Sequence, residues 1–71
     1  LEKTKEALDI VKGLIAKEIT PTEKIRAFYN AGELSMKLNQ NEEAKKYFQE
    51  CTNIEEKSSW KDICEQNLKL L

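Results

Sequence analysis

Apolar residues recur every three or four positions along most of the chain, which is the spacing of one face of an α-helix. Short polar segments interrupt this pattern at three places. The pattern therefore predicts an all-α fold of four antiparallel helices, at about residues 2–19, 21–38, 42–56 and 60–71.

The first predicted helix carries a wide apolar stripe, made of Ala7, Leu8, Ile10, Val11, Leu14, Ile15 and Ile19. A stripe of this width predicts a helix that is packed on two sides. Gly13 lies in the middle of the same helix and costs it roughly 1 kcal/mol relative to alanine. We therefore expect the backbone of the next helix to approach closely at Gly13.

Capping residues mark where the later helices begin. Thr20 and Glu23 have the spacing of a capping box, in which each side chain bonds the backbone N–H of the other, and Pro21 suits the first helical position. Asn41 is expected to cap the third helix. Ser59 is expected to cap the fourth helix in the same way as Thr20 caps the second.

The second and third predicted helices are separated by only a few polar residues, so they must lie antiparallel and side by side. Folding the chain about Gln40 places Gly32 opposite Phe48 and Met36 opposite Ala44. A small residue then faces a large one at each level, which is how closely packed helices fill space.

This hairpin resembles the tetratricopeptide repeat, a helix-turn-helix unit of 34 residues with the pattern W-x2-L-G-x2-Y…A-x3-F…P. Residues 28–32, FYNAG, stand for the first block, and residues 44–48, AKKYF, reproduce the second. The chain departs from the pattern because Ala31 replaces a leucine, Ser35 replaces a large aromatic residue, and no proline follows the second helix of the pair.

The resemblance implies a role in binding other proteins or peptides, because the first helix of each pair in this family lines a concave groove. It also implies that the first predicted helix ends a preceding repeat, that the fourth caps the last exposed face, and that the chain is one domain at the end of a longer solenoid. The implied partner-binding residues are Arg26, Tyr29, Asn30, Glu33, Met36 and Lys37. Each of these side chains also suits an ordinary solvated position.

The two cysteines are predicted to face each other. A hairpin of the third and fourth helices centred between Lys57 and Ser58 places Cys51 opposite Cys64. Packed helix axes lie ~8–10 Å apart, and this brings inward-pointing Cα atoms within reach of a disulfide. Two reduced cysteines buried as small hydrophobic residues fit the same positions. We expect the disulfide, because a core this small gains from a covalent link.

The redox state of this pair decides the expected location. A disulfide places the protein in an oxidising compartment, which in a bacterium is the periplasm or beyond, and reduced cysteines place it in the cytoplasm.

Composition argues against several other functions. The chain has 12 basic and 13 acidic residues, and no basic run is longer than Lys45-Lys46, so we expect no nucleic-acid partner. No apolar run approaches the ~20 residues that span a bilayer, so we expect no direct membrane insertion. The chain has no histidine, no glycine-rich phosphate loop and no cysteine cluster with zinc spacing, so we expect no enzyme activity, metal or cofactor.

Three functions remain open. The first is a protein-interaction scaffold and, by resemblance to cell-envelope members of the family in Gram-negative bacteria, one that helps to assemble a machine such as the flagellar motor or the division apparatus. The second is an oligomerisation or solenoid-capping module without a groove ligand. The third is a regulatory helical domain attached to a catalytic neighbour.

Overall fold

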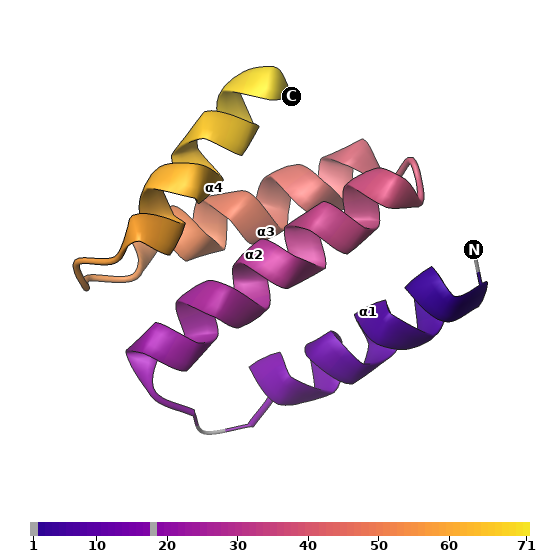
Figure 1. Ribbon diagram of the computed structural model, residues 1–71, viewed down its shortest axis with the longest axis horizontal. Coiled ribbons are helices and arrows are strands. Elements are labelled where there is room, and N and C mark those ends of the chain that lie inside the picture. The colour runs from indigo at the N-terminus through magenta and orange to yellow at the C-terminus, as the bar shows by residue number, and fades with distance from the viewer. Residues whose placement is uncertain (1, 18) are drawn as a thin grey trace.

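The regular structure of the chain is entirely helical in the part that the computed structural model describes, residues 2–17 and 19–71. The all-α prediction is therefore confirmed. Figure 1 shows α2 in the centre of the molecule, with α1 on one side and the α3–α4 pair on the other, and successive helices run in opposite directions. The helices are α1 (Glu2–Ile15), α2 (Pro21–Lys37), α3 (Asn41–Asn53) and α4 (Ser59–Leu70).

The core lies between α2, α3 and α4, and it is centred on Phe48. Its fully buried residues are Ile25, Ala44, Phe48, Cys51 and Cys64. The Phe48 ring fits against α2 because Gly32 has no side chain, and a Cβ atom built on Gly32 would lie 2.6 Å from Phe48 Cε1. The prediction that Gly32 faces Phe48 is thus confirmed. Met36 packs against the same core.

The turn between α2 and α3 is closed by backbone hydrogen bonds. Asn39 adopts a left-handed conformation with φ 60°, its N–H bonds Met36 O, and the N–H of Gln40 bonds Ser35 O. This pair of bonds is the Schellman motif that ends many helices. The predicted cap at Asn41 is wrong: Gln40 occupies the N-cap without a side-chain bond, because the Schellman bonds already fix the chain where α3 begins.

α2 begins where the sequence predicts, and α1 is shorter than predicted. Thr20 has β-region backbone angles. Its Oγ1 accepts a hydrogen bond from the N–H of Glu23 at 3.2 Å, which is one of the two bonds of the predicted capping box. The residue before a proline avoids the helical region, so the chain must leave the helix before Thr20. It does so after Ile15, not at residue 19. Residue 18, which the pattern assigned to the first helix, lies outside the described residues.

The later helix ends also differ from the predicted ones by one to three residues. Ser58 rather than Ser59 caps α4, because the Ser58 hydroxyl accepts from the N–H of Trp60 at 3.2 Å. α3 ends at Asn53, and the segment that follows is held to the start of α2, since Thr22 Oγ1 donates to Glu56 at 2.9 Å.

α1 packs on one side only within the described part of the chain. It contacts α2 and no other helix there, so the prediction of packing on two sides is not met. Ile10 is 67% exposed and Leu14 is 43% exposed. The prediction for Gly13 is wrong too, because no atom of another described helix lies within 4 Å of a Cβ placed there.

Candidate partner-binding face

The central helix α2 carries an aromatic and charged cluster where α4 crosses it. The Trp60 ring, in the first turn of α4, lies 5.0 Å from the Tyr29 ring of α2 at an interplanar angle of 46°. The guanidinium of Arg26 lies over the same indole, with Cζ 5.6 Å from the ring centroid. Arg26 is exposed, and both aromatic residues are half-buried. Because Arg26, Tyr29, Glu33 and Trp60 are candidates for contact with a partner, we call them the binding face.

Glu33 holds the phenol of Tyr29 within this face. A hydrogen bond from the phenol to the Glu33 carboxylate is the main cause that raises the pKa of Tyr29 above its ordinary value of 10.0, and burial and the negative charge of Glu33 act in the same direction. The phenol therefore keeps its proton and acts as a hydrogen-bond donor to Glu33.

The six residues predicted to bind a partner fall into two environments. Arg26, Asn30, Glu33 and Lys37 line a groove between α1 and α2. Tyr29 and Met36 instead lie on the side of α2 that packs against the core. Arg26 and Glu33 belong to both the groove and the binding face, which are therefore continuous along α2.

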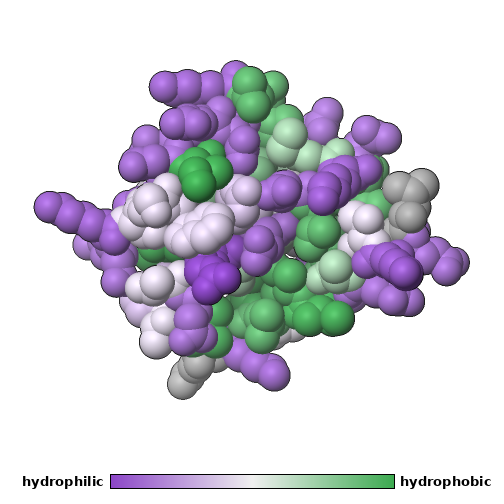
Figure 2. Space-filling view, in the orientation of Figure 1, coloured by the Kyte–Doolittle hydropathy of each residue, from purple (hydrophilic) through white to green (hydrophobic). Residues whose placement is uncertain are grey.

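The other wall of this groove is apolar and comes from α1 and the segment after it. Figure 2 shows hydrophobic side chains gathered over α1 and along its boundary with α2. The residues that supply this wall are Ala7, Val11, Leu14 and Ile19. We call this feature the α1–α2 groove. An apolar wall opposite a charged one is suited to an amphipathic partner.

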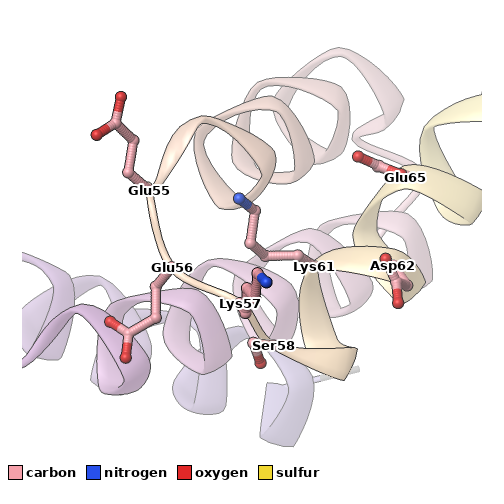
Figure 3. Close-up of a pocket in the computed structure, with 7 residues that line it drawn as sticks. All are labelled: Glu55, Glu56, Lys57, Ser58, Lys61, Asp62 and Glu65. Atoms are coloured by element: carbon pink, nitrogen blue, oxygen red, sulfur yellow. The ribbon is translucent and has the colours of Figure 1, made fainter.

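A third hollow, around the α3–α4 connection, has no such character. It is lined by Glu55, Glu56, Lys57, Ser58, Lys61, Asp62 and Glu65. Figure 3 shows that the carboxylates of Glu55 and Glu56 point in different directions rather than converging. No group of three or more acidic, cysteine or histidine side chains within the described residues could hold a metal ion. The hollow is a solvated polar surface.

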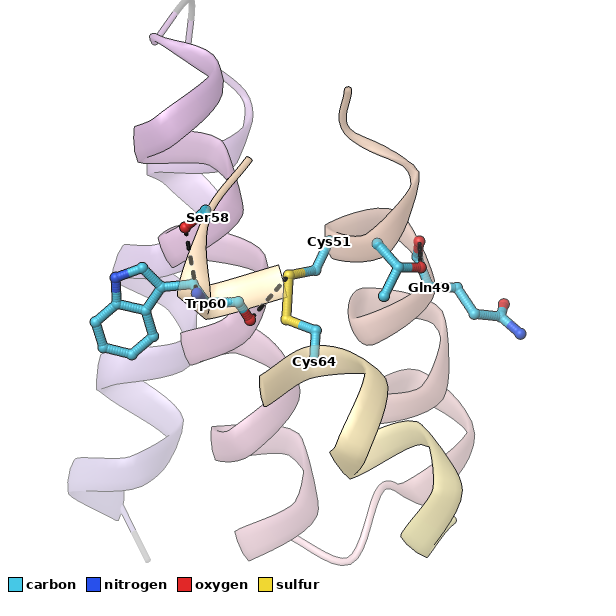
Figure 4. Close-up of a disulfide and its surroundings, with 6 residues drawn as sticks. Gln49, Cys51, Ser58, Trp60 and Cys64 are labelled. Carbon is cyan, nitrogen blue, oxygen red and sulfur yellow. Dashed lines mark hydrogen bonds between the residues drawn. A yellow bond between two sulfur atoms is a disulfide. The ribbon is translucent and has the colours of Figure 1, made fainter. Parts of the chain in front are cut away.

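Behind the binding face, a disulfide joins α3 to α4. Cys51 and Cys64 are bridged, with their Cα atoms 6.3 Å apart, and both are fully buried. Figure 4 shows the bridge beside the first turn of α4, where Cys51 Sγ lies 4.0 Å from the carbonyl oxygen of Trp60. The structure thus brings together the two cysteines that the predicted hairpin of the third and fourth helices places opposite each other.

Comparison with known families assigns the central hairpin. The family model for the tetratricopeptide repeat matches residues 25–58, which comprise most of α2, all of α3 and the segment up to the cap of α4. Residues 25–58 form a tetratricopeptide-like repeat. A search of curated proteins and a search of solved structures each found no match.

The buried positions agree with the repeat pattern. The residues at its Leu, Gly, Ala and Phe positions, which are Ala31, Gly32, Ala44 and Phe48, are all buried. Tetratricopeptide repeats generally mediate binding to other proteins or peptides and are typically non-catalytic. Within the described residues, no helix is both long enough and apolar enough to span a bilayer.

Sequence reasoning missed the part that Trp60 plays in this face. Its spacing with Ile63 and Cys64 predicted only the apolar side of the fourth helix. The contact with Tyr29 and Arg26 depends on the angle at which α4 crosses α2, and no periodicity within one helix encodes that angle. The one feature of the sequence that pointed to this contact was the position of Trp60 in the first turn after a helix cap. A side chain at that position lies close to the preceding helices.

Proposed function

We propose that this chain is a protein-interaction scaffold that binds a peptide segment of another protein through the binding face. The observation that supports this most strongly is the exposed Arg26 over Trp60, beside Tyr29. Arginine, tryptophan and tyrosine are the residues most enriched at the energetic centres of protein interfaces. Their rotamers are already restricted here by mutual contact, which lowers the entropy lost on binding.

The proposed setting is an oxidising compartment, such as the periplasm of a Gram-negative bacterium, where the chain takes part in an envelope assembly such as the flagellar motor or the division machinery. The buried Cys51–Cys64 bridge supports the compartment, because such bridges persist outside the reducing cytosol. The intact mass of unreduced protein, taken from its native cells and treated with alkylating reagent under denaturing conditions, tests this proposal. We expect no alkylation; alkylation of both cysteines would place the protein in the cytoplasm.

Site-specific photo-crosslinking tests the proposed partner site. A photoreactive amino acid at Asn30, which is exposed beside the binding face, is expected to give a discrete crosslinked product in the native cell. The matched control is Gln49, an exposed amide on α3 whose side chain points away from α2. Equal crosslinking at both positions, or none at Asn30, would argue against partner binding at this face.

The exposed side of α1 favours a second candidate function, in which another helix covers the α1–α2 groove. Ile10 and Leu14 are large apolar side chains that the described chain leaves open, and Gly13 beside them leaves room for a close approach. The covering helix would come from a neighbouring repeat of a longer solenoid or from a second copy of the chain.

Sedimentation velocity separates these two sources of a covering helix. A concentration-dependent dimer that Ile10→Glu abolishes would identify a second copy. A monomer at every concentration would exclude a second copy and leave a neighbouring repeat as the source.

A further inference from the structure

We infer that the Cys51–Cys64 disulfide is the positioning element of the binding face, because it fixes the first turns of α4 and so holds Trp60 against Arg26 and Tyr29. Only the name binding face, given to the cluster of Trp60, Arg26 and Tyr29, rests on the proposed function. The physical claim concerns the position of Trp60 and can be measured without any partner.

The first support is that little else holds α4. Cys64 is the only fully buried residue of this helix, and its other apolar residues, Trp60, Ile63 and Leu68, are half-buried. In Figure 1 the C-terminal end of α4 projects away from α3, and Leu70 there is 76% exposed. The contacts that hold α4 against α2 and α3 therefore lie mainly in its first turns, near Cys64.

The second support is the short distance from the bridge to Trp60. Trp60 precedes Cys64 by four residues, so both lie on the same face of α4 one turn apart. On the core side the Trp60 carbonyl is 4.0 Å from Cys51 Sγ. On the outer side its ring contacts Tyr29 and Arg26. A displacement of Cys64 relative to Cys51 must therefore move the indole away from α2.

The third support is the weakness of the connection between α3 and α4. The hydrogen bond from Thr22 to Glu56, which ties this segment to α2, is exposed to solvent, and exposed hydrogen bonds contribute little net stability. The Ser58 cap fixes where α4 begins but makes no bond to another helix. Neither of these contacts replaces the covalent link.

Reduction by a dithiol provides the test. A thiolate of the reagent attacks one sulfur of the bridge, which forms a mixed disulfide with that cysteine and releases the other cysteine. The second thiol of the reagent then attacks the mixed disulfide and releases the remaining cysteine. The products are two cysteine thiols and the cyclic disulfide of the reagent. Trp60 is the only tryptophan of the chain, so its fluorescence reports its own surroundings without labelling.

The expected result of reduction is a red shift of the Trp60 emission and greater quenching by acrylamide. Amide hydrogen exchange, followed residue by residue, is expected to show loss of protection in α4 while α2 and α3 remain protected. The double variant Cys51→Ser, Cys64→Ser should reproduce both changes without reagent, which excludes an effect of the dithiol itself.

Two outcomes would overturn the inference. Unchanged Trp60 emission with α4 still protected would mean that packing alone positions the helix. Equal loss of protection in α2, α3 and α4 would mean that the bridge stabilises the whole domain rather than positioning α4. Neither outcome bears on partner binding, which the crosslinking at Asn30 tests separately.

Discussion

Gly32 and Phe48 are in direct contact across the α2–α3 interface, where a Cβ atom on Gly32 would lie 2.6 Å from Phe48 Cε1. Because Phe48 is fully buried, its ring has no free space into which to move. Gly13 lies in an equally regular helix, but no atom of another described helix lies within 4 Å of a Cβ placed there. Only the first of these two glycines is required by packing inside the described chain.

The same substitution at the two glycines should therefore have opposite effects. Alanine gains roughly 1 kcal/mol of helix propensity at either position, but at Gly32 the added methyl group overpacks the core at a cost of about 1–3 kcal/mol. Gly13→Ala is expected to raise the melting temperature measured by circular dichroism, and Gly32→Ala to lower it. A stable Gly32→Ala variant would show that the helix register is wrong.

Ser35 is a buried residue whose hydroxyl oxygen has no hydrogen-bond partner among residues 2–17 and 19–71. Leaving such a group unsatisfied costs about 1–3 kcal/mol, and its removal leaves little empty volume. Ser35→Ala is therefore expected to increase the free energy of unfolding by roughly 1 kcal/mol, as measured by urea denaturation. A decrease would mean that the hydroxyl is bonded in solution.

Glu33 sets the titration of Tyr29. In a Tyr47→Phe background, where Tyr29 is the only tyrosine, absorbance titration should give a pKa above the ordinary value of 10.0. Glu33→Gln removes the negative charge and should bring this pKa back toward that value. An unchanged pKa in Glu33→Gln would mean that the carboxylate does not contact the phenol.

The raised pKa of Tyr29 also predicts how stability depends on pH. A group with a higher pKa in the folded state than in the unfolded state stabilises the fold fully below the unfolded value. Its contribution is then lost as the pH rises through the folded value. The free energy of unfolding is therefore expected to fall above about pH 10, and to fall less in Glu33→Gln.

The sequence predicts this fold well where local chemistry decides it. The helical period and the short turn at Gln40 are enough to pair Gly32 with Phe48, and the Thr20 cap locates the start of α2. The cap of α3 could not be predicted from Asn41, because the Schellman bonds depend on the left-handed conformation of Asn39.

Features set by relative helix orientation were beyond the sequence pattern. The apolar period continues from Ile15 to Ile19, so periodicity does not locate the end of α1 at Ile15. Trp60 joins the binding face because α4 crosses α2 near Tyr29, and that crossing arises from the packing of three helices together. The sequence pattern therefore offered Arg26, Tyr29 and Glu33 as candidates but not Trp60 on α4, and partner binding at any of them stays a prediction.

The most direct test of the proposed binding face is the affinity for peptides selected from a random display library on the oxidised chain. Arg26→Glu should weaken their binding by about tenfold or more, since Arg26 lies over the Trp60 indole and arginine is enriched at the energetic centres of interfaces. Lys46→Glu makes the same charge change at an exposed site on α3 and should leave the dissociation constant unchanged. Equal affinities for Arg26→Glu and Lys46→Glu would contradict the proposal that this face binds the partner.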